Sequence, residues 1–150
     1  MRKADREITD PAELEAMLRE TNVVNLGLWD GEQVYVVPMN YGYRDNALYI
    51  HCALEGRKID ILKRNPQVCF TVTRDQQVVE GEKACGWSTH FRSIIGYGVA
   101  TFLEGREEKI DGLNAFMAQF TDKPMEYRED LIPVTAVIRI DISEMTGKRH

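Results

Sequence analysis

Residues 51–66, HCALEGRKIDILKRNP, predict the end of a β-strand, a short turn and a helix of two to three turns. Asn65 and Pro66 end the helix, because a proline disfavours helical backbone in the residue before it. The helix begins with Arg57 and Lys58. A helix N-terminus already carries about half a positive charge, so two cations there are unfavourable unless an anion lies beside them. The stretch therefore indicates an anion-binding turn.

The turn before this helix has the composition of a phosphate site. Backbone N–H groups in a first helical turn lack internal partners and bind phosphate readily. Gly56 permits a tight bend, the Arg57 guanidinium matches phosphate oxygens, and Lys58 adds a point charge. The alternative is a solvated basic turn that pairs with a nearby acid such as Glu55. The spacing alone does not separate these two interpretations.

Length and composition predict one globular domain that spans residues 1–150. The chain has 43% apolar and 29% charged residues, as globular domains usually do. Its formal net charge of −5 argues against general attraction to nucleic acid or to an anionic membrane. No run of about 18 apolar residues occurs, which predicts no membrane span. The first residues lack the apolar stretch of a signal peptide, so we expect a cytoplasmic protein.

Three cysteines, Cys52, Cys69 and Cys85, are widely spaced and form no CxxC pair. This pattern argues against a disulfide framework and against a structural zinc site. We expect reduced and mostly buried thiols, because free cysteine packs as a small hydrophobe. We therefore predict no metal site.

The spacing of apolar residues and turn signals predicts six strands and three helices. Asp10 is the expected N-cap of the first helix, with Pro11 at its first position. The segment 76–91 has a polar centre and is expected to be irregular. The predicted helices are 11–22, 56–65 and 106–124, and the predicted strands are 23–29, 34–43, 47–53, 68–75, 92–104 and 135–147. This order predicts a mainly β fold, a small antiparallel barrel with flanking helices.

Residues 37–43, VPMNYGY, interrupt an otherwise apolar strand with proline, asparagine and glycine. Pro38 leaves a neighbouring carbonyl without its ladder partner, and Asn40 can both donate and accept hydrogen bonds. A flat heteroaromatic ring with an N–H and carbonyl edge would find complementary groups here. The alternative is a bulged edge strand, which is common.

His51 lies near the end of the predicted strand 47–53. Successive side chains of a strand point to opposite faces, so His51 and Cys52 point apart and should not bind one metal. His90 and His150 lie elsewhere and add no ligand cluster. From the residues alone, His51 is either a structural or exposed histidine or a member of a functional site. The chain has no GxGxxG motif and no P-loop, so neither a Rossmann site nor a Walker ATPase is predicted.

Three segments in order carry a family resemblance: VVPMNYGY (36–43), ALYIHCALEGRKIDILKRNPQVCF (47–70) and RSIIGYG (92–98). Together they resemble the FMN-binding split-barrel proteins of the pyridoxamine 5'-phosphate oxidase-like superfamily. Within it, they are most similar to the nitroimidazole-resistance (Nim) proteins. The resemblance runs from about Val34 to Leu103, and the run HCA-x-EGRK-x-D-x-LK-x-NP-x-VCF is highly specific. It implies a six-stranded antiparallel split β-barrel with flanking helices.

The resemblance also implies a site. Arg57 and Lys58 match the basic pair that holds the flavin phosphate, and residues 38–41 match the strand along the isoalloxazine ring. His51 would lie close to the flavin and to any bound substrate, which makes it the candidate catalytic residue. The residues implied for cofactor binding are Pro38, Met39, Asn40, Tyr41, His51, Cys52, Arg57, Lys58 and Ser93. In these families the flavin lies in a groove between two subunits, so the resemblance implies a homodimer.

The implied function is a flavin-dependent oxidoreductase that reduces a small aromatic or nitroaromatic substrate. FMN is the expected cofactor, with FAD as an alternative and haem, held by His51, as a less favoured one. The alternative function is a non-catalytic module that binds or senses flavin or haem. Pyridoxamine phosphate oxidases hold their vitamin substrate with an Arg/Trp-rich C-terminal segment, whereas this sequence ends DISEMTGKRH soon after the last strand. Vitamin B6 oxidation is therefore not expected.

Overall fold

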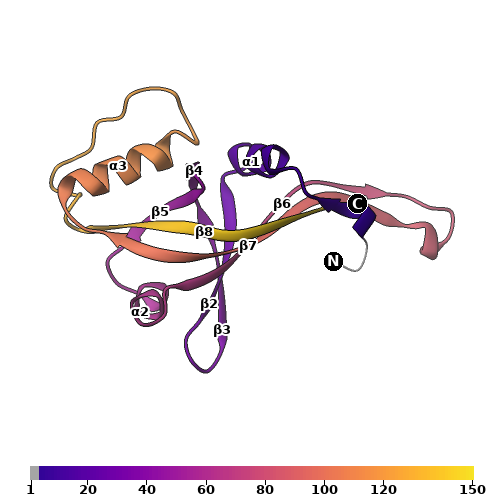
Figure 1. Ribbon diagram of the computed structural model, residues 1–150, viewed down its shortest axis with the longest axis horizontal. Coiled ribbons are helices and arrows are strands. Elements are labelled where there is room, and N and C mark those ends of the chain that lie inside the picture. The colour runs from indigo at the N-terminus through magenta and orange to yellow at the C-terminus, as the bar shows by residue number, and fades with distance from the viewer. Residues whose placement is uncertain (1–3) are drawn as a thin grey trace.

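One curled antiparallel sheet dominates the structure, a computed structural model that describes residues 4–150 (Figure 1). The predicted domain also includes residues 1–3, which lie outside the described residues. The strands are β1 (Glu7–Ile8), β2 (Val23–Trp29), β3 (Val34–Asn40), β4 (Gly42–Arg44), β5 (Ala47–Ala53), β6 (Gln67–Val79), β7 (Ser88–Leu103) and β8 (Thr135–Arg149). The helices are α1 (Pro11–Arg19), α2 (Arg57–Arg64) and α3 (Arg106–Met117), with short 3-10 turns at Ala4–Arg6 and Ala84–Gly86.

The sheet runs in the order β3-β2-β6-β7-β8-β5-β4, and β1 pairs with β8. Within residues 4–150 it therefore has eight strands in place of the six predicted. One extra strand arises because the predicted strand 34–43 divides at Tyr41. Its first part, β3, pairs with β2, and its second part, β4, pairs with β5. The two parts lie at opposite ends of the strand order, so the sheet is not closed between them. This opening is the split of the predicted split barrel.

The long strands β6 and β7 continue beyond the body as a two-stranded arm (Figure 1). The prediction of an irregular segment over 76–91 is therefore confirmed for its centre, residues 80–87, and wrong for its two ends, which belong to β6 and β7. Both faces of the arm meet water, so its strands lack the apolar face that marks a half-buried strand. Cys85 lies exposed in the arm, while Cys52 and Cys69 are only partly buried, contrary to the expected burial of all three thiols.

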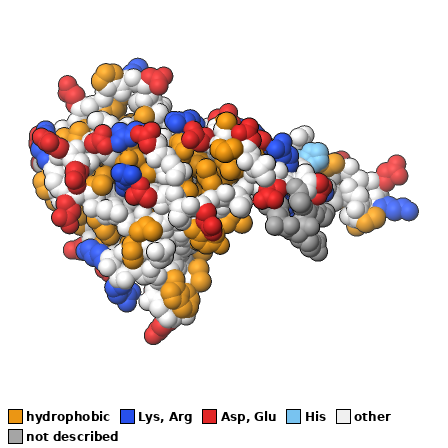
Figure 2. Space-filling model, viewed as in Figure 1, with side chains coloured by type: hydrophobic (Ala, Val, Ile, Leu, Met, Phe, Trp, Pro, Cys, Tyr) orange, Lys and Arg blue, Asp and Glu red, His pale blue; other side chains and the backbone are white. Residues whose placement is uncertain are grey.

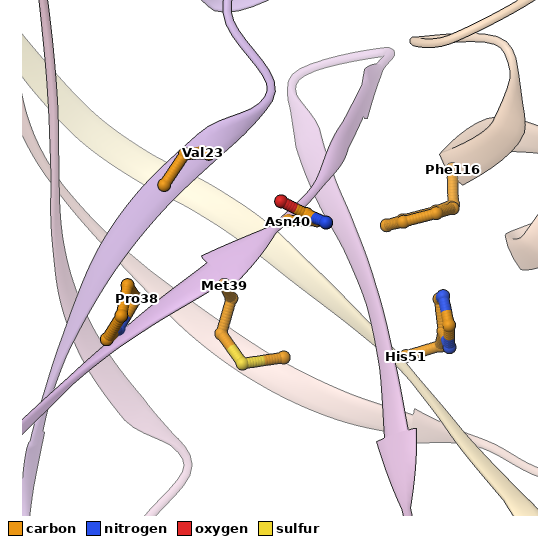
Figure 3. A pocket seen from close by; sticks show the side chains of 6 residues that line it. All are labelled: Val23, Pro38, Met39, Asn40, His51 and Phe116. Carbon is orange, nitrogen blue, oxygen red and sulfur yellow. The ribbon is translucent and has the colours of Figure 1, made fainter.

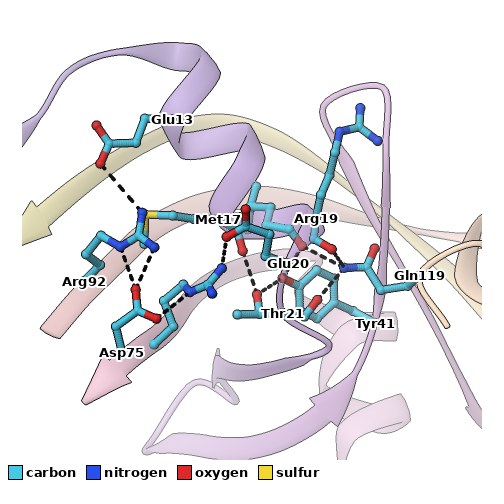
Figure 4. Close-up of polar contacts among 11 residues, drawn as sticks. Glu13, Met17, Arg19, Glu20, Thr21, Tyr41, Asp75, Arg92 and Gln119 are labelled. Carbon is cyan, nitrogen blue, oxygen red and sulfur yellow. Dashed lines mark hydrogen bonds and ion pairs between the residues drawn. The ribbon is translucent and has the colours of Figure 1, made fainter. Parts of the chain in front are cut away.

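Ion pairs join the base of the arm to α1 and to the residue that follows it, near the N-terminus (Figure 4). Arg92 lies 2.6 Å from the Asp75 carboxylate on the neighbouring strand and 3.9 Å from Glu13 of α1. Arg74 pairs with Glu20, directly after α1. These groups are partly exposed, so each pair adds little stability alone, and the set mainly fixes the direction in which the arm leaves the body.

The signals at the start of α1 are confirmed. The Asp10 side chain accepts a hydrogen bond from the Ala12 N–H at 3.0 Å, and Pro11 stands at the first helical position. The helix ends at Arg19, before the predicted end, because side chains bind its last carbonyls. Thr21 donates to the Met17 carbonyl at 2.9 Å.

Helix α3 covers the face of β5 that points away from the barrel interior. Ala47 and Tyr49 of β5 pack against Ala115 and Phe116 of α3 in a cluster separate from the main core. The opposite face of β5 contributes Leu48, Ile50 and partly buried Cys52 to the main core. The predicted alternation of this strand is thus confirmed. Within residues 4–150, no helix is both long and apolar enough to cross a membrane.

Candidate functional site

A cavity of about 440 Å³ lies where the sheet is split (Figure 3). Its walls come from four elements that are distant in sequence: the start of β2, the end of β3, the end of β5 and α3. The residues that line it are Val23, Pro38, Met39, Asn40, His51 and Phe116. The structure therefore brings four of the predicted site residues into one place.

Strand β3 supplies the long wall of this cavity. It stands at one end of the sheet and pairs only with β2 among the described strands. Backbone N–H and C=O groups on its other edge therefore have no ladder partner. Pro38 and Asn40 are exposed on one face of β3, whereas Met39 points to the other and is partly buried. This edge can bind a planar ligand that carries both donors and acceptors.

His51 lies opposite β3, with its ring against Phe116 (Figure 3). The two ring centroids are 4.5 Å apart, and the rings meet edge to face at 84°. Partial burial lowers the pKa of His51 below its usual 6.5, and the positive charge of Lys58 lowers it further. His51 is consequently neutral at pH 7, with one ring nitrogen that donates and one that accepts hydrogen bonds.

Lys58 stands directly behind the cavity wall. Its Nζ lies 3.1 Å from the Sδ atom of Met39, which lines the cavity. A thioether is a weak acceptor and carries no charge. Among residues 4–150, no carboxylate lies within 4.0 Å of this ammonium group. Lys58 therefore presents a positive charge, one side chain away from the cavity, that lacks a carboxylate partner among the described residues.

Arg57 is engaged differently. Its Nη2 donates to Asp30 of the β2–β3 hairpin at 3.1 Å, and its guanidinium lies over the Tyr35 ring at 4.8 Å. The backbone N–H groups of Gln33 and Glu32, and then Arg57 itself, lower the pKa of Asp30 from 3.8 to about 2. Asp30 is thus ionised at neutral pH. The alternative interpretation of a paired basic turn applies to Arg57, with Asp30 as the partner in place of Glu55.

The turn that precedes α2 has the expected geometry. Gly56 is the N-cap residue, with φ of 121° and no side chain to cap the helix. A residue with a Cβ atom is strained in that conformation, so glycine is required here. The first N–H groups of α2 remain available to an anion beside Arg57 and Lys58.

Besides Arg57 and Lys58, three more of the predicted site residues do not line the cavity. Tyr41 is fully buried, and its hydroxyl donates to the Leu18 carbonyl at 2.8 Å. Cys52 points into the core side of β5, where burial raises the pKa of its thiol and Lys58 partly offsets this. Ser93 lies on β7 beside Thr73, near the base of the arm.

Two lining residues, Val23 and Phe116, were not predicted from the sequence. Phe116 belongs to the helical apolar pattern of α3 and is indistinguishable there from a core residue. Val23 is the first residue of β2, and its neighbourhood with β3 appears only once the strands pair. Neither carries a local signal of ligand binding. Among the described residues, no group of three or more His, Cys, Asp or Glu side chains is arranged to hold a metal ion.

The placement of Tyr41 leads to a prediction. Tyr41→Phe removes a buried hydroxyl that bonds to Leu18 and, at 2.6 Å, to Thr21. We expect the free energy of unfolding to fall by about 1 kcal/mol, the usual net worth of such a bond. The flavin binding that the sequence resemblance implies should not change, because the side chain lies away from the cavity. Urea unfolding and flavin titration check both parts, and loss of flavin affinity without loss of stability would contradict the structural role.

Comparison with known families agrees with this architecture. The model of a family described as pyridoxamine 5'-phosphate oxidase matches residues 10–149. The chain belongs to the pyridoxamine 5'-phosphate oxidase family. The match spans nearly all of the sequence and confirms the predicted superfamily. A search of curated proteins finds no match.

Solved structures show which type of pyridoxamine 5'-phosphate oxidase family member this chain is similar to. A candidate 5-nitroimidazole antibiotic resistance protein of Bacteroides thetaiotaomicron is 32% identical, with a TM-score of 0.86 over 95% of this chain and 86% of that one. This confirms the predicted likeness to the nitroimidazole-resistance type.

Two more distant structures show the shared fold alone. The flavocytochrome Anf3 of Azotobacter vinelandii is 21% identical, with a TM-score of 0.86 over 100% of this chain and 72% of that one. An FAD-binding protein of Mesorhizobium loti is 24% identical, with a TM-score of 0.72 over 97% of each chain. These likenesses agree with the open sheet and confirm the split-barrel fold.

Proposed function

We propose that the protein binds FMN at the split of its barrel and acts as a flavin-dependent oxidoreductase on small aromatic substrates, with nitroaromatic compounds as the favoured class. The observation that carries the proposal is the position of Lys58. Its ammonium group touches Met39 of the cavity wall at 3.1 Å and has no carboxylate partner among residues 4–150. A phosphate beside the cavity supplies the missing anion.

The residues present fit both ends of FMN. Lys58 and the first N–H groups of α2 would bind the phosphate, and Arg57 would add hydrogen bonds from the nitrogens that Asp30 does not occupy. The free edge of β3 and the Asn40 amide would bind the donor and acceptor groups of the isoalloxazine ring. When bound, the flavin would supply electron transfer between a reduced donor and the substrate.

The chain's own part is to hold and orient. Phe116 and Pro38 provide apolar surfaces against which flat rings pack. The neutral His51 imidazole can donate a hydrogen bond to a nitro oxygen and orient the substrate. The likeness to a candidate 5-nitroimidazole resistance protein supports this substrate class.

The spectrum of the purified protein tests the proposal. We expect the two absorption bands of an oxidised flavin, their loss when NADH is added without oxygen, and their return when a nitroimidazole is then added as the oxidant. A Soret band would instead favour a haem module with His51 as a ligand. Flavin that binds but is turned over by no donor, nitroaromatic or quinone would favour a non-catalytic sensor. A protein that takes up neither chromophore would refute the proposal.

His51→Ala should keep the flavin and lose turnover. A hydrogen-bonding or proton-donating group in a site typically contributes about 100-fold or more to rate, so we expect kcat to fall by about that factor. The pKa of His51 lies below 6.5, so the wild-type rate profile should show an inflection on the acid side of that value that the variant lacks. His90→Ala, in the arm, is the matched control. Full activity of His51→Ala would remove this residue from the catalytic machinery.

We also propose that the site is completed by a second copy of the chain. The outer face of β3, β2, β6 and β7 carries an open apolar groove of about 540 Å³. Val34, Val36, Ile95 and Tyr97 on this face are all about half exposed or more. Hydrophobic side chains gather on the body, including the β2–β3 hairpin, in the view of Figure 2. An apolar face of this kind usually marks an interface.

The occupant of this face follows from its position. Along β3, the exposed residues Val34 and Val36 continue directly into Pro38 and Asn40, which line the cavity. A partner on the apolar face therefore also borders the flavin site. A second copy presents the same apolar face, so a twofold arrangement covers both at once.

A further inference from the structure

The side-chain amide of Gln119 joins three segments of the chain, and Figure 4 shows it beside Arg19 and Thr21. Its Nε2 donates to the carbonyls of Leu18 and Arg19, at 2.8 and 2.9 Å, and also to that of Thr21. Its Oε1 accepts from the backbone N–H of Tyr43 at 3.0 Å. Both ends of the amide are therefore used, and carbonyls at the end of α1 that lack helical partners are satisfied.

Each of these three segments delivers one wall of the cavity. Phe116 precedes Gln119 by one helical turn. Val23, which begins β2, follows Thr21 by two residues. Asn40, which ends β3, precedes Tyr43 by three residues. The Gln119 amide thus lies at the point where the separately placed walls are tied to one another.

The position of Phe116 is fixed from the other side by close packing. A Cβ atom on Gly42 would lie 2.3 Å from the Ala115 carbonyl oxygen and 2.5 Å from the Cα of Phe116. The helix backbone therefore rests directly on β4 and cannot move closer to it. Gln119 prevents movement in the opposite direction, because such movement breaks its bonds to the end of α1.

We propose that Gln119 is a positioning residue that holds the Phe116 ring against His51, and that Phe116 thereby sets the size of the planar substrate that the cavity admits. The proposal rests on the proposed function in taking the cavity as the substrate site. Phe116 stands opposite β3 and edge-on to His51, 4.5 Å away. Phe116 is the one lining residue that comes from a helix, whereas the other lining residues belong to strands of the sheet.

Nuclear magnetic resonance of the full chain tests the positioning step without reference to the cofactor. The ring current of Phe116 shifts the imidazole protons of His51, whose signal is identified by its loss in His51→Ala. Gln119→Met keeps the length of the side chain and removes every hydrogen bond of the amide. We expect it to move the His51 signal most of the way to its position in Phe116→Leu, and to raise the pKa of His51 toward 6.5 as the ring loses its cover.

The control is Gln77→Ala, an exposed glutamine in the arm. It should leave the His51 signal where it is. A merely structural role for Gln119 lowers the melting temperature of Gln119→Met but leaves the His51 shift and pKa unchanged in the folded protein, and that result overturns the proposal. If Gln119→Met does not fold, Phe116→Leu still tests the proposal. An unchanged His51 signal in Phe116→Leu would show that the Phe116 ring does not lie against His51, and this also overturns the proposal.

Ligand size tests the second step in the FMN-loaded protein. Probes are 2-methyl-5-nitroimidazole, with one ring, and 5-nitroindazole, with two fused rings, each titrated by its perturbation of the flavin bands. We expect Phe116→Leu and Gln119→Met to shift the ratio of the two dissociation constants by about tenfold toward the larger probe. Phe91→Ala is the control, because Phe91 lies near the base of the arm and does not line the cavity.

The two levels of failure are distinguishable. If the wild-type chain does not bind FMN, the proposed function is refuted. The positioning role of Gln119 can still be tested in that case, because the His51 signal is measured without the cofactor. Normal FMN binding with an unchanged ratio in both variants refutes the role of Phe116 in substrate size. A changed ratio in Phe116→Leu alone refutes the positioning role of Gln119.

Discussion

Replacing Arg57 and Lys58 together by alanine is expected to weaken FMN binding by about 100-fold or more while the fold stays intact. A hydrogen bond to a charged group contributes about 1.5–3 kcal/mol, and about 1.4 kcal/mol corresponds to a factor of ten. The variant removes both side-chain cations beside the first turn of α2. Neither residue belongs to the core, so circular dichroism should not change. Quenching of flavin fluorescence gives the affinity.

The loss of FMN affinity should differ between the two single variants, Arg57→Ala and Lys58→Ala. Lys58 has no carboxylate partner among residues 4–150, whereas Arg57 is already paired with Asp30 at 3.1 Å. We therefore expect Lys58→Ala to cause the larger share of the loss. Asp30→Asn should release Arg57 toward the phosphate and leave FMN affinity equal or higher.

Two controls separate phosphate recognition from general charge. Lys63→Ala with Arg64→Ala removes two cations from the last turn of the same helix, where both side chains are exposed. Riboflavin has the same ring as FMN but no phosphate, so its affinity should be the same in the wild type and in the Arg57/Lys58 variant. An equal loss of affinity for FMN and riboflavin, or an unchanged affinity for FMN, would contradict phosphate binding by Arg57 and Lys58.

Local signals predicted the parts of the site that depend on neighbouring residues. Asp10 with Pro11 marked the start of α1, and Asn65 with Pro66 marked the end of α2. The alternation of residues 47–53 placed His51 and Cys52 on opposite faces, as the structure confirms. These features follow from backbone sterics and strand periodicity, which a few adjacent residues determine.

The remaining features depend on pairings between distant segments. Tyr41 was predicted to be a site residue. In the structure β3 ends just before it, the Tyr41 ring is buried in the core, and its hydroxyl donates to a carbonyl at the end of α1. Phe116 reaches the cavity only because α3 lies directly on Gly42, some seventy positions earlier in the chain. Contacts between segments this far apart in the chain are not encoded in any local sequence pattern. From the sequence, such residues therefore cannot be distinguished from ordinary core residues.

Val36→Asp is expected to convert a dimer into a monomer and to lower FMN affinity in the same step. Val36 is 61% exposed on the apolar face and lines its groove. In a twofold assembly the substitution buries two unpaired carboxylates, which costs several kcal/mol. Light scattering should then report the 17.2 kDa of one chain in place of twice that mass. The matched control is Val134→Asp, which alters a 57% exposed valine before β8 and should leave the dimer intact.

The coupling between the two readouts decides whether the partner completes the site. Val36 and Pro38 lie on the same face of β3, and Pro38 lines the cavity. If the second copy borders the flavin, FMN affinity and dimer content should fall together, and added FMN should shift the variant back toward the dimer. A monomeric variant with wild-type FMN affinity would show that one chain forms the whole site. A variant that stays dimeric would show that this face is not the interface, because two buried carboxylates cannot be accommodated there without a measurable loss of association.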